Sequence, residues 1–365
     1  MHAFGLLCTT RRIFPLIPIV CSVLAADVGP IGDSAGARFA ERVVDQMPHY
    51  QPQQSVSGEI RLWGHGSFSR PFMRRLVARW VNGFARFHPE IKIVEETYGT
   101  SSAIPALALG VGDLAILGEE ILPEAIDTFE RMKSYPPFGV EIATGSVNVR
   151  NFDYAQMFFV HKDNPLTQLT LVQLDAIFGA EHRRGPVNIR TWGELGLKGD
   201  WADKPITPYG WKTDDSFGFY LEATFLAGSH RWNCALREFA HITRPDGTIY
   251  DHGQQALDGL GGDRYGIAVS NVRYAGPNVR ALAVAEREGT PYVAVSEESL
   301  IMQTYPLTRL IPAFLDRPPG QPIEPKMKEF LRDILSREGQ RDILEDGGYL
   351  PLNADAVALQ LRKLE

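Results

Sequence analysis

Short apolar runs alternate with amphipathic helical patterns from residue 58 onward, and this alternation restricts the fold more than any other feature. Runs of strand length occur at 59–63, 91–96 and 114–117, and helical periodicity separates them at 71–88 and 103–109. Strands and helices that alternate at this spacing form parallel sheets with right-handed crossovers. The sequence therefore predicts an α/β fold.

The same style continues along the rest of the chain. Strand patterns recur at 157–160, 206–209 and 266–270, and helical patterns at 171–178, 217–226, 325–336 and 339–346. A chain of 365 residues holds about two domains at roughly 100–200 residues each. We expect two α/β units with cores of their own.

Charge disfavours two classes of partner. The chain has 37 Lys and Arg against 44 Asp and Glu, a net charge of −7, and no run of five basic residues. Nucleic acids and anionic membranes are bound through clustered basic side chains that release counterions. The sequence therefore predicts no nucleic-acid partner.

The N-terminus has the layout of a secretory signal peptide over residues 1–26. Arg11 and Arg12 precede an apolar stretch at 13–24, and two alanines end it. The stretch is shorter than the roughly 20 residues of a spanning helix, so we expect cleavage and export to the periplasm. Lipidation of Cys21 stays open as an alternative, but Pro18 stands where a lipoprotein signal prefers an aliphatic residue, and we expect no lipid anchor.

The segment at 27–57 is rich in Gly, Pro, Gln and Ser. We interpret it as a tether outside the main fold, with a short helix at 37–47. Beyond the expected signal peptide Cys234 is the one cysteine, which excludes an internal disulfide. No Cys/His cluster has zinc spacing, so we expect neither a metal nor a cofactor.

Polar loops follow several of the predicted strands, and ligands of open α/β sheets bind beyond the carboxyl ends of strands. In the first loop, at 64–71, Ser69 can cap the next helix and the Ser67 hydroxyl can face a ligand. A capped helix start without a ligand is the alternative. In the second loop, Thr100, Ser101 and Ser102 offer more hydroxyls than capping requires.

Two further positions are candidates for binding. Asp113 opens a predicted strand and could accept a proton-bearing oxygen of a ligand, although a solvated turn Asp is equally consistent with its neighbours. In the loop at 210–218, Thr213 and Ser216 could donate hydrogen bonds and Lys212 could neutralise an anion. The two acidic residues between them favour the start of the next helix.

Taken in order, these segments resemble the PstS-like phosphate-binding branch of the periplasmic binding proteins of ABC transporters. The similarity covers 58–352. Its strongest pieces are "GDLAILGEE" at 112–120, "HKDNPLTQLTLVQLDAIFGA" at 161–180, "RTWGELG" at 190–196, "YGIAVS" at 265–270, "TYPLTRLI" at 304–311 and "REGQRDILEDGGYLPL" at 337–352.

The resemblance implies a two-lobe type II binding-protein fold that closes by hinge motion on an oxyanion. It divides the chain into a first lobe of 58–152 and 266–365 and a second lobe of 153–265. It assigns ligand contacts to Ser67 and Phe68, to Thr100, Ser101 and Ser102, and to Asp113 as acceptor of the ligand's proton. The chain departs from the family's Arg and Ser-Gly-Thr run at 211–216, where Lys212 cannot replace the bidentate fork of an arginine.

We therefore predict an exported solute-binding protein, monomeric and not an enzyme, that captures an inorganic oxyanion for an ABC permease. Phosphate is the first candidate, and the altered loop at 211–216 leaves other oxyanions open. A sensor or accessory protein for another small ligand is a second hypothesis. An exported hydrolase is a third, and the absence of a Gly-x-Ser-x-Gly motif and of any oriented histidine argues against it.

Overall fold

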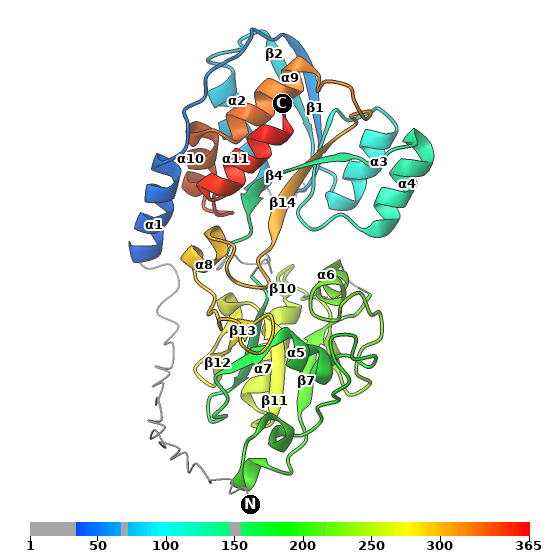
Figure 1. Ribbon diagram of the computed structural model, residues 1–365, viewed down its shortest axis with the longest axis vertical. Helices are drawn as coiled ribbons and strands as arrows, with labels where there is room; N and C mark the ends of the chain where they lie inside the picture. The colour runs from blue at the N-terminus through cyan, green and yellow to red at the C-terminus, as the bar shows by residue number, and fades with distance from the viewer. Residues whose placement is uncertain (1–33, 67–71, 147–154, 215) are drawn as a thin grey trace, which may run out of the picture.

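Two mixed five-stranded sheets form the centres of two lobes, one above the other in Figure 1. The computed structural model describes residues 34–66, 72–146, 155–214 and 216–365. Within these ranges, no helix is both long enough and apolar enough to cross a membrane. The α/β class and the two-lobe architecture predicted from the sequence are confirmed.

The sheet of lobe 1 has the order β2-β1-β3-β14-β4. Its strands are β1 (Gly58–Gly64), β2 (Ile91–Glu96), β3 (Leu114–Ile116), β4 (Phe138–Thr144) and β14 (Leu310–Leu315). The first three are parallel, and β14 runs antiparallel between β3 and β4. Among the described residues, helices around this sheet include α2 (Phe72–Phe84), α3 (Ala103–Ala108), α4 (Pro123–Lys133), α9 (Pro325–Ile334), α10 (Arg337–Asp346) and α11 (Ala354–Lys363).

The sheet of lobe 2 has the order β12-β5-β11-β7-β8. Its strands are β5 (Met157–His161), β7 (Thr207–Trp211), β8 (Arg237–Phe239), β11 (Gly266–Ser270) and β12 (Val279–Ala281). This lobe also contains the helices α5 (Leu171–Phe178), α6 (Ser216–Thr224) and α7 (His252–Gly261). Two small two-stranded sheets complete it: β6 (Gln168–Thr170) pairs with β13 (Ala283–Ala285), and β9 (Ile242–Thr243) pairs with β10 (Ile249–Tyr250). Helix α8 (Glu297–Ile301) lies near the junction of the lobes (Figure 1).

The boundary predicted at residue 266 is too early. Strands β11 and β12 pair with β5, so they belong to the second sheet. The chain returns to the first sheet with β14, which begins at Leu310. Strand periodicity does not reveal which sheet a strand joins, because that depends on partners more than 100 residues away.

Helix α2 shows why the local predictions succeeded. Its buried side chains are spaced three and four residues apart, at Met73, Leu76, Val77, Trp80 and Phe84, and form one apolar stripe. The indole N–H of Trp80 donates to the carbonyl of Gly339 on α10 at 3.0 Å. The amphipathic pattern therefore determines which face of α2 is buried, and α10 packs against this helix.

Residues 34–57 are not a tether outside the fold. Helix α1 (Ser34–Asp45) buries Ala40 and Val44, and Tyr50 is buried behind it. The Tyr50 hydroxyl donates to Glu329 on α9 at 2.7 Å, and the backbone N–H of Arg337 donates to Pro48. This segment therefore packs on lobe 1. The rest of the expected tether and the expected signal peptide lie outside the described residues.

Candidate functional site

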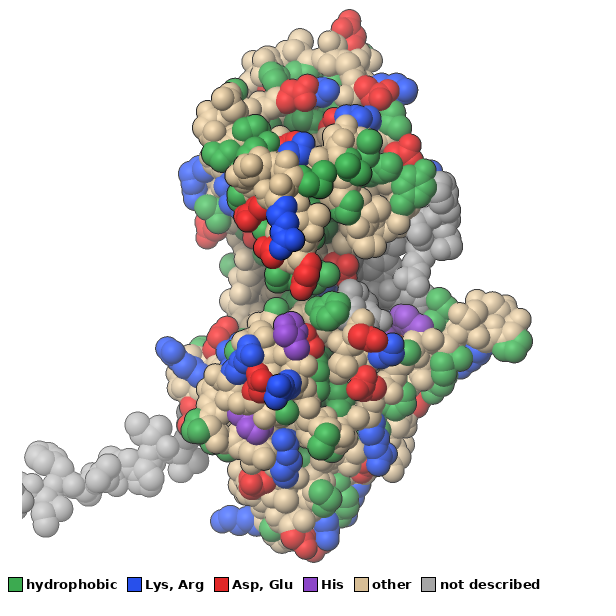
Figure 2. All heavy atoms as spheres, turned by 90° about the vertical axis from the view of Figure 1, so that its right-hand side faces the viewer, with side chains coloured by type: hydrophobic (Ala, Val, Ile, Leu, Met, Phe, Trp, Pro, Cys, Tyr) green, Lys and Arg blue, Asp and Glu red, His purple; other side chains and the backbone are tan. Residues whose placement is uncertain are grey.

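The strand directions point the polar loops of both lobes toward each other. In lobe 1 the chain arrives from lobe 2 at the start of β14, and β14 is antiparallel to β3. The carboxyl ends of β1, β2 and β3 therefore face lobe 2. In lobe 2 the first residue of β5 pairs with Ser270 at the end of β11, and β7 and β8 run parallel to β11. Their carboxyl ends face lobe 1 across the waist visible in Figure 2.

A cluster of polar side chains occupies the inner edge of lobe 1. Thr100 follows β2, His65 follows β1 and Gly118 follows β3. The Thr100 hydroxyl oxygen accepts the Gly118 N–H at 3.0 Å and lies 3.2 Å from His65 Nδ1. On its other side, His65 Nε2 is hydrogen-bonded to the Tyr349 hydroxyl. The first two loops predicted from the sequence therefore meet at one edge.

Close backbone approach holds these loops together. The N–H of Gly99 donates to the carbonyl of Gly64, and the N–H of His65 donates to Ile116, both at 2.9 Å. Gly64 and Gly99 have φ angles of 122° and 98°, which L side chains rarely adopt. A Cβ atom on Gly118 would lie 2.0–2.5 Å from the His65 ring. Glycine at these positions is thus a requirement of the site's geometry.

The other two hydroxyls of the second loop lie beside Thr100. Ser101 is exposed, whereas Ser102 is half-buried. The Ser102 hydroxyl donates backward to the Gly99 carbonyl at 2.7 Å and makes no cap to α3. Ser102 therefore already uses its hydroxyl within the loop, whereas Ser101 is exposed on the surface.

An ion pair stands next to this cluster, where β3 ends and β14 begins. Arg309 is 1% exposed in its side chain, and its guanidinium donates to both carboxylate oxygens of Glu120, with distances from 2.5 to 3.2 Å. Its other face covers the ring of Tyr220 on α6 at 4.2 Å. Since Tyr220 belongs to lobe 2, Arg309 contacts both lobes at the inner edge.

The loop of lobe 2 is polar and open. Lys212 and Asp214 form an ion pair at 2.7 Å, and both side chains are exposed. The backbone N–H of Thr213 donates to Glu238 at 3.1 Å. Ser216 begins α6, and its side chain, like residue 215, is not among those described. The carboxylates at 214 and 238 thus accept from Lys212 and from the Thr213 N–H.

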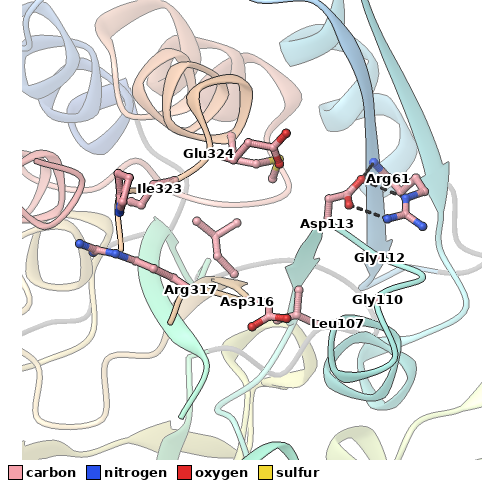
Figure 3. A pocket seen from close by; sticks show the side chains of 12 residues that line it. Arg61, Leu107, Gly110, Gly112, Asp113, Asp316, Arg317, Ile323 and Glu324 are labelled. Carbon is pink, nitrogen blue, oxygen red and sulfur yellow. Dashed lines mark hydrogen bonds and ion pairs between the residues drawn. The ribbon is translucent and has the colours of Figure 1, made fainter. Parts of the chain in front are cut away.

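Asp113 does not join this site. It directly precedes β3 and lies beside Arg61, in the middle of β1, so it is at the end of β3 that points away from lobe 2. Its carboxylate accepts from the backbone N–H, Nε and a terminal nitrogen of Arg61 at 2.8, 3.0 and 2.6 Å (Figure 3). Burial would raise the pKa of Asp113, but the hydrogen bonds and charge of Arg61 outweigh burial and lower it. The prediction that Asp113 accepts a ligand's proton is corrected: it accepts hydrogen bonds from Arg61.

The pocket around Asp113 has a volume of about 250 Å³. Figure 3 shows Arg317 and Asp316 from the end of β14, with Glu324 before α9, on its other walls. Arg317 donates to the Gln321 carbonyl, and Asp316 accepts from Tyr135 and pairs with Lys133. These charges are satisfied within the lobe, so the pocket is a structural feature of its outer edge.

Three predicted contacts, Ser67, Phe68 and Ser69, lie outside the described residues. Reasoning from the sequence did not single out four members of the inner edge: His65, Glu120, Arg309 and Tyr349. A signal existed for Glu120, since it follows a buried strand in the same way as Thr100 follows β2. Arg309 and Tyr349 gave no such signal, because pairing with segments about 190 and 280 residues away brings them here.

Two α/β lobes, with the carboxyl ends of their strands opposed across a waist, are the architecture of the type II periplasmic-binding-protein fold. PstS from Borrelia burgdorferi has this fold: its solved structure gives a TM-score of 0.54 at 14% identity and covers 81% of this chain and 100% of its own. In sequence the chain is similar to PstS proteins. It is 29% identical over 337 residues to the phosphate-binding protein PstS of two Pseudomonas aeruginosa strains, PAO1 and UCBPP-PA14, which covers 92% of this chain and 96% of the relative. No family model matches the chain.

Proposed function

We propose that this chain is the phosphate-binding protein of an ABC transporter, which captures phosphate between its lobes without catalysing a reaction. Similarity to the Pseudomonas PstS along nearly the whole chain supports this function. The observation that carries it is the convergence of the Thr100 and Gly118 loops at an edge that faces the opposing loop of lobe 2. Other oxyanions remain competitors to be tested.

Local dipoles explain how an acidic protein can hold an anion. Phosphate would receive hydrogen bonds from hydroxyls and backbone N–H groups, and these donors need no net positive charge. From lobe 1 we assign this role to Thr100 and Ser101, and to Ser102 once its hydroxyl leaves the Gly99 carbonyl. We also assign it to Ser67, Phe68 and Ser69, which lie outside the described residues. From lobe 2 we assign it to Lys212, Thr213 and Ser216 at the start of α6.

The carboxylate at the inner edge is Glu120. Phosphate near neutral pH carries one proton, and a second proton for part of the time, so a carboxylate can accept a hydrogen bond from it. Arg309 already balances the charge of Glu120 at 2.5 Å, so this carboxylate repels the anion less than an unpaired one would. We therefore assign to Glu120 the acceptor role first expected of Asp113.

Isothermal titration of the purified chain with phosphate tests the proposal, with sulfate titrated in parallel. Thr100→Val removes the hydroxyl at nearly constant volume, and we expect phosphate affinity to fall by about tenfold or more because hydrogen bonds to charged groups contribute about 1.5–3 kcal/mol. Thr128→Val on the exposed face of α4, where the hydroxyl bonds only its own helix, is the matched control. Wild-type protein that releases no heat with millimolar phosphate contradicts the assignment.

Export and delivery need separate tests. We propose that residues 1–26 are removed on export to the periplasm and that the mature monomer docks on an inner-membrane permease. N-terminal sequencing of the periplasmic protein should begin after Ala26. Deletion of the gene should abolish high-affinity phosphate uptake; uptake that stays normal while phosphate binding is intact would identify a sensor or accessory protein instead.

A further inference from the structure

Two histidines and an aspartate from separate segments meet at the inner edge of lobe 2. His241 follows β8, and Asp251 and His252 begin α7. His241 Nδ1 lies 3.4 Å from Asp251 Oδ2, and His252 Nε2 lies 4.0 Å from Asp251 Oδ1. One potential ligand atom of each residue lies within 4.8 Å of the other two. None of these residues belongs to the phosphate site proposed above.

One carboxylate oxygen of Asp251 has no hydrogen-bond donor among the described residues. Its side chain is 4% exposed, and Oδ1 caps α7 by accepting the Gly253 N–H at 2.8 Å. Oδ2 is buried and accepts no hydrogen bond from any residue in the described ranges. Buried carboxylate oxygens normally have a donor or a cation beside them. His241 Nδ1 lies 3.4 Å from this oxygen, and a neutral imidazole nitrogen can bind a cation.

This donor set selects one class of ion. Two imidazole nitrogens and one carboxylate oxygen suit Zn²⁺ and related divalent transition metals, whereas Mg²⁺ and Ca²⁺ prefer oxygen ligands alone. Ligand bonds of about 2.0–2.1 Å around a tetrahedral ion place neighbouring ligand atoms roughly 3.4 Å apart, as His241 and Asp251 already are. We propose that His241, Asp251 and His252 form a binding site for a divalent transition-metal ion of the Zn²⁺ type.

The rings must rearrange to close the site. The His241 and His252 rings stack with centroids 4.1 Å apart and planes 16° apart, and His252 also stacks on Trp211 at 5.0 Å. A nitrogen lone pair lies in the plane of its ring, so two stacked rings cannot both point at one ion. His252 is fully buried, whereas the His241 side chain is 33% exposed. His241 is therefore the ligand that turns when the ion binds.

The remaining geometry favours an open metal site. The exposed side of His241 leaves a fourth position to solvent, where water or an anion can bind. The amino end of α7 carries partial positive charge, which the full negative charge of Asp251 offsets. Because Trp211 ends β7 directly before Lys212, a metal that reorders the ring stack changes the surroundings of an indole next to the lobe 2 loop.

Titration of the full mature chain with zinc chloride, after EDTA treatment and in phosphate-free buffer, tests the site. We expect one Zn²⁺ per chain, and Co²⁺ should give visible absorption bands of a low-coordinate nitrogen and oxygen site. His241→Ala should weaken Zn²⁺ binding by about tenfold or more. His230→Ala, an exposed histidine of the same lobe paired with Glu222, is the matched control and should bind like the wild type.

A second variant separates ligand loss from damage to the fold. Asp251→Asn keeps an acceptor for the helix cap but removes the charge, so it should lose Zn²⁺ affinity while retaining its phosphate affinity and its circular dichroism spectrum. Wild-type protein without stoichiometric Zn²⁺ binding overturns the site, and so does an unchanged affinity in His241→Ala. Because metal and phosphate are titrated separately, failure of this site leaves the phosphate proposal untouched, and the reverse also holds.

Discussion

Removal of the Asp113 carboxylate should cost stability and leave phosphate binding unchanged. Asp113→Ala breaks three hydrogen bonds of 2.6–3.0 Å to Arg61. The Asp113 side chain is 19% exposed, but that of Arg61 is 39% exposed, so water solvates much of the released guanidinium. We therefore expect a loss of about 1–2 kcal/mol, between the values for exposed ion pairs and for buried charged hydrogen bonds.

Thermal denaturation measures this loss. At about 2–4 °C per kcal/mol for a unit of roughly 150–250 residues, the melting temperature should fall by about 2–8 °C at pH 7. The pKa of Asp113 is lower in the folded state than its ordinary value of 3.8, so its contribution is complete above that value and disappears as the pH falls through the folded pKa. The difference in melting temperature between the variant and the wild type should therefore shrink as the pH falls below 3.8.

The control is Asp127→Ala, which removes an exposed carboxylate from α4. It should change neither the melting temperature nor the phosphate affinity. Phosphate titration of Asp113→Ala should give an affinity within about twofold of the wild type, because the carboxylate lies at the edge of lobe 1 away from lobe 2. A tenfold weaker phosphate affinity with an unchanged melting temperature would refute this placement and restore Asp113 as a ligand.

Two further predictions follow from the same lobe. Gly118→Ala should weaken phosphate binding by about tenfold at constant circular dichroism, because its Cβ would displace the His65 ring from Thr100; an unchanged affinity would separate this ring from the site. Burial, with Asp342 and Glu338 nearby, raises the pKa of Asp333 to about 7, so its ionisation destabilises the fold as the pH rises from about 4 to 7. Asp333→Asn should therefore melt a few degrees above the wild type at pH 8 and level with it at pH 4, and an equal difference at both pH values would contradict the raised pKa.

Patterns that depend on near neighbours in sequence could be predicted. The helix expected at 71–88 is α2, Phe72–Phe84, and the strand expected at 91–96 has the observed bounds. Both depend on side-chain spacing within a few residues, which burial of one face decides. The hydroxyl loop at Thr100 was found for the same reason, because it directly follows its strand.

Features that depend on distant pairing could not be predicted. Strand β14 inserts between β3 and β4 from nearly 200 residues away, and that insertion brings Arg309 to Glu120. Helix α1 gave only a weak periodic signal, yet it packs on α10 because the chain folds back across lobe 1. The composition of 27–57 indicated an exposed segment, whereas the hydrogen bond of Tyr50 to Glu329 joins this segment to lobe 1.

The misplacement of Asp113 has a simpler cause, since the rule for ligand loops already contained the answer. Ligands lie beyond the carboxyl ends of parallel strands, and Asp113 stands before its strand. A strand rises about 3.3 Å per residue, so the length of β3 from Leu114 to Ile116 puts Asp113 roughly 13 Å from Leu117, where the inner edge begins. Glu120 follows the same strand. When two carboxylates flank one strand, the direction of the chain determines which of them can meet a ligand. Residue type and flanking glycines do not determine this.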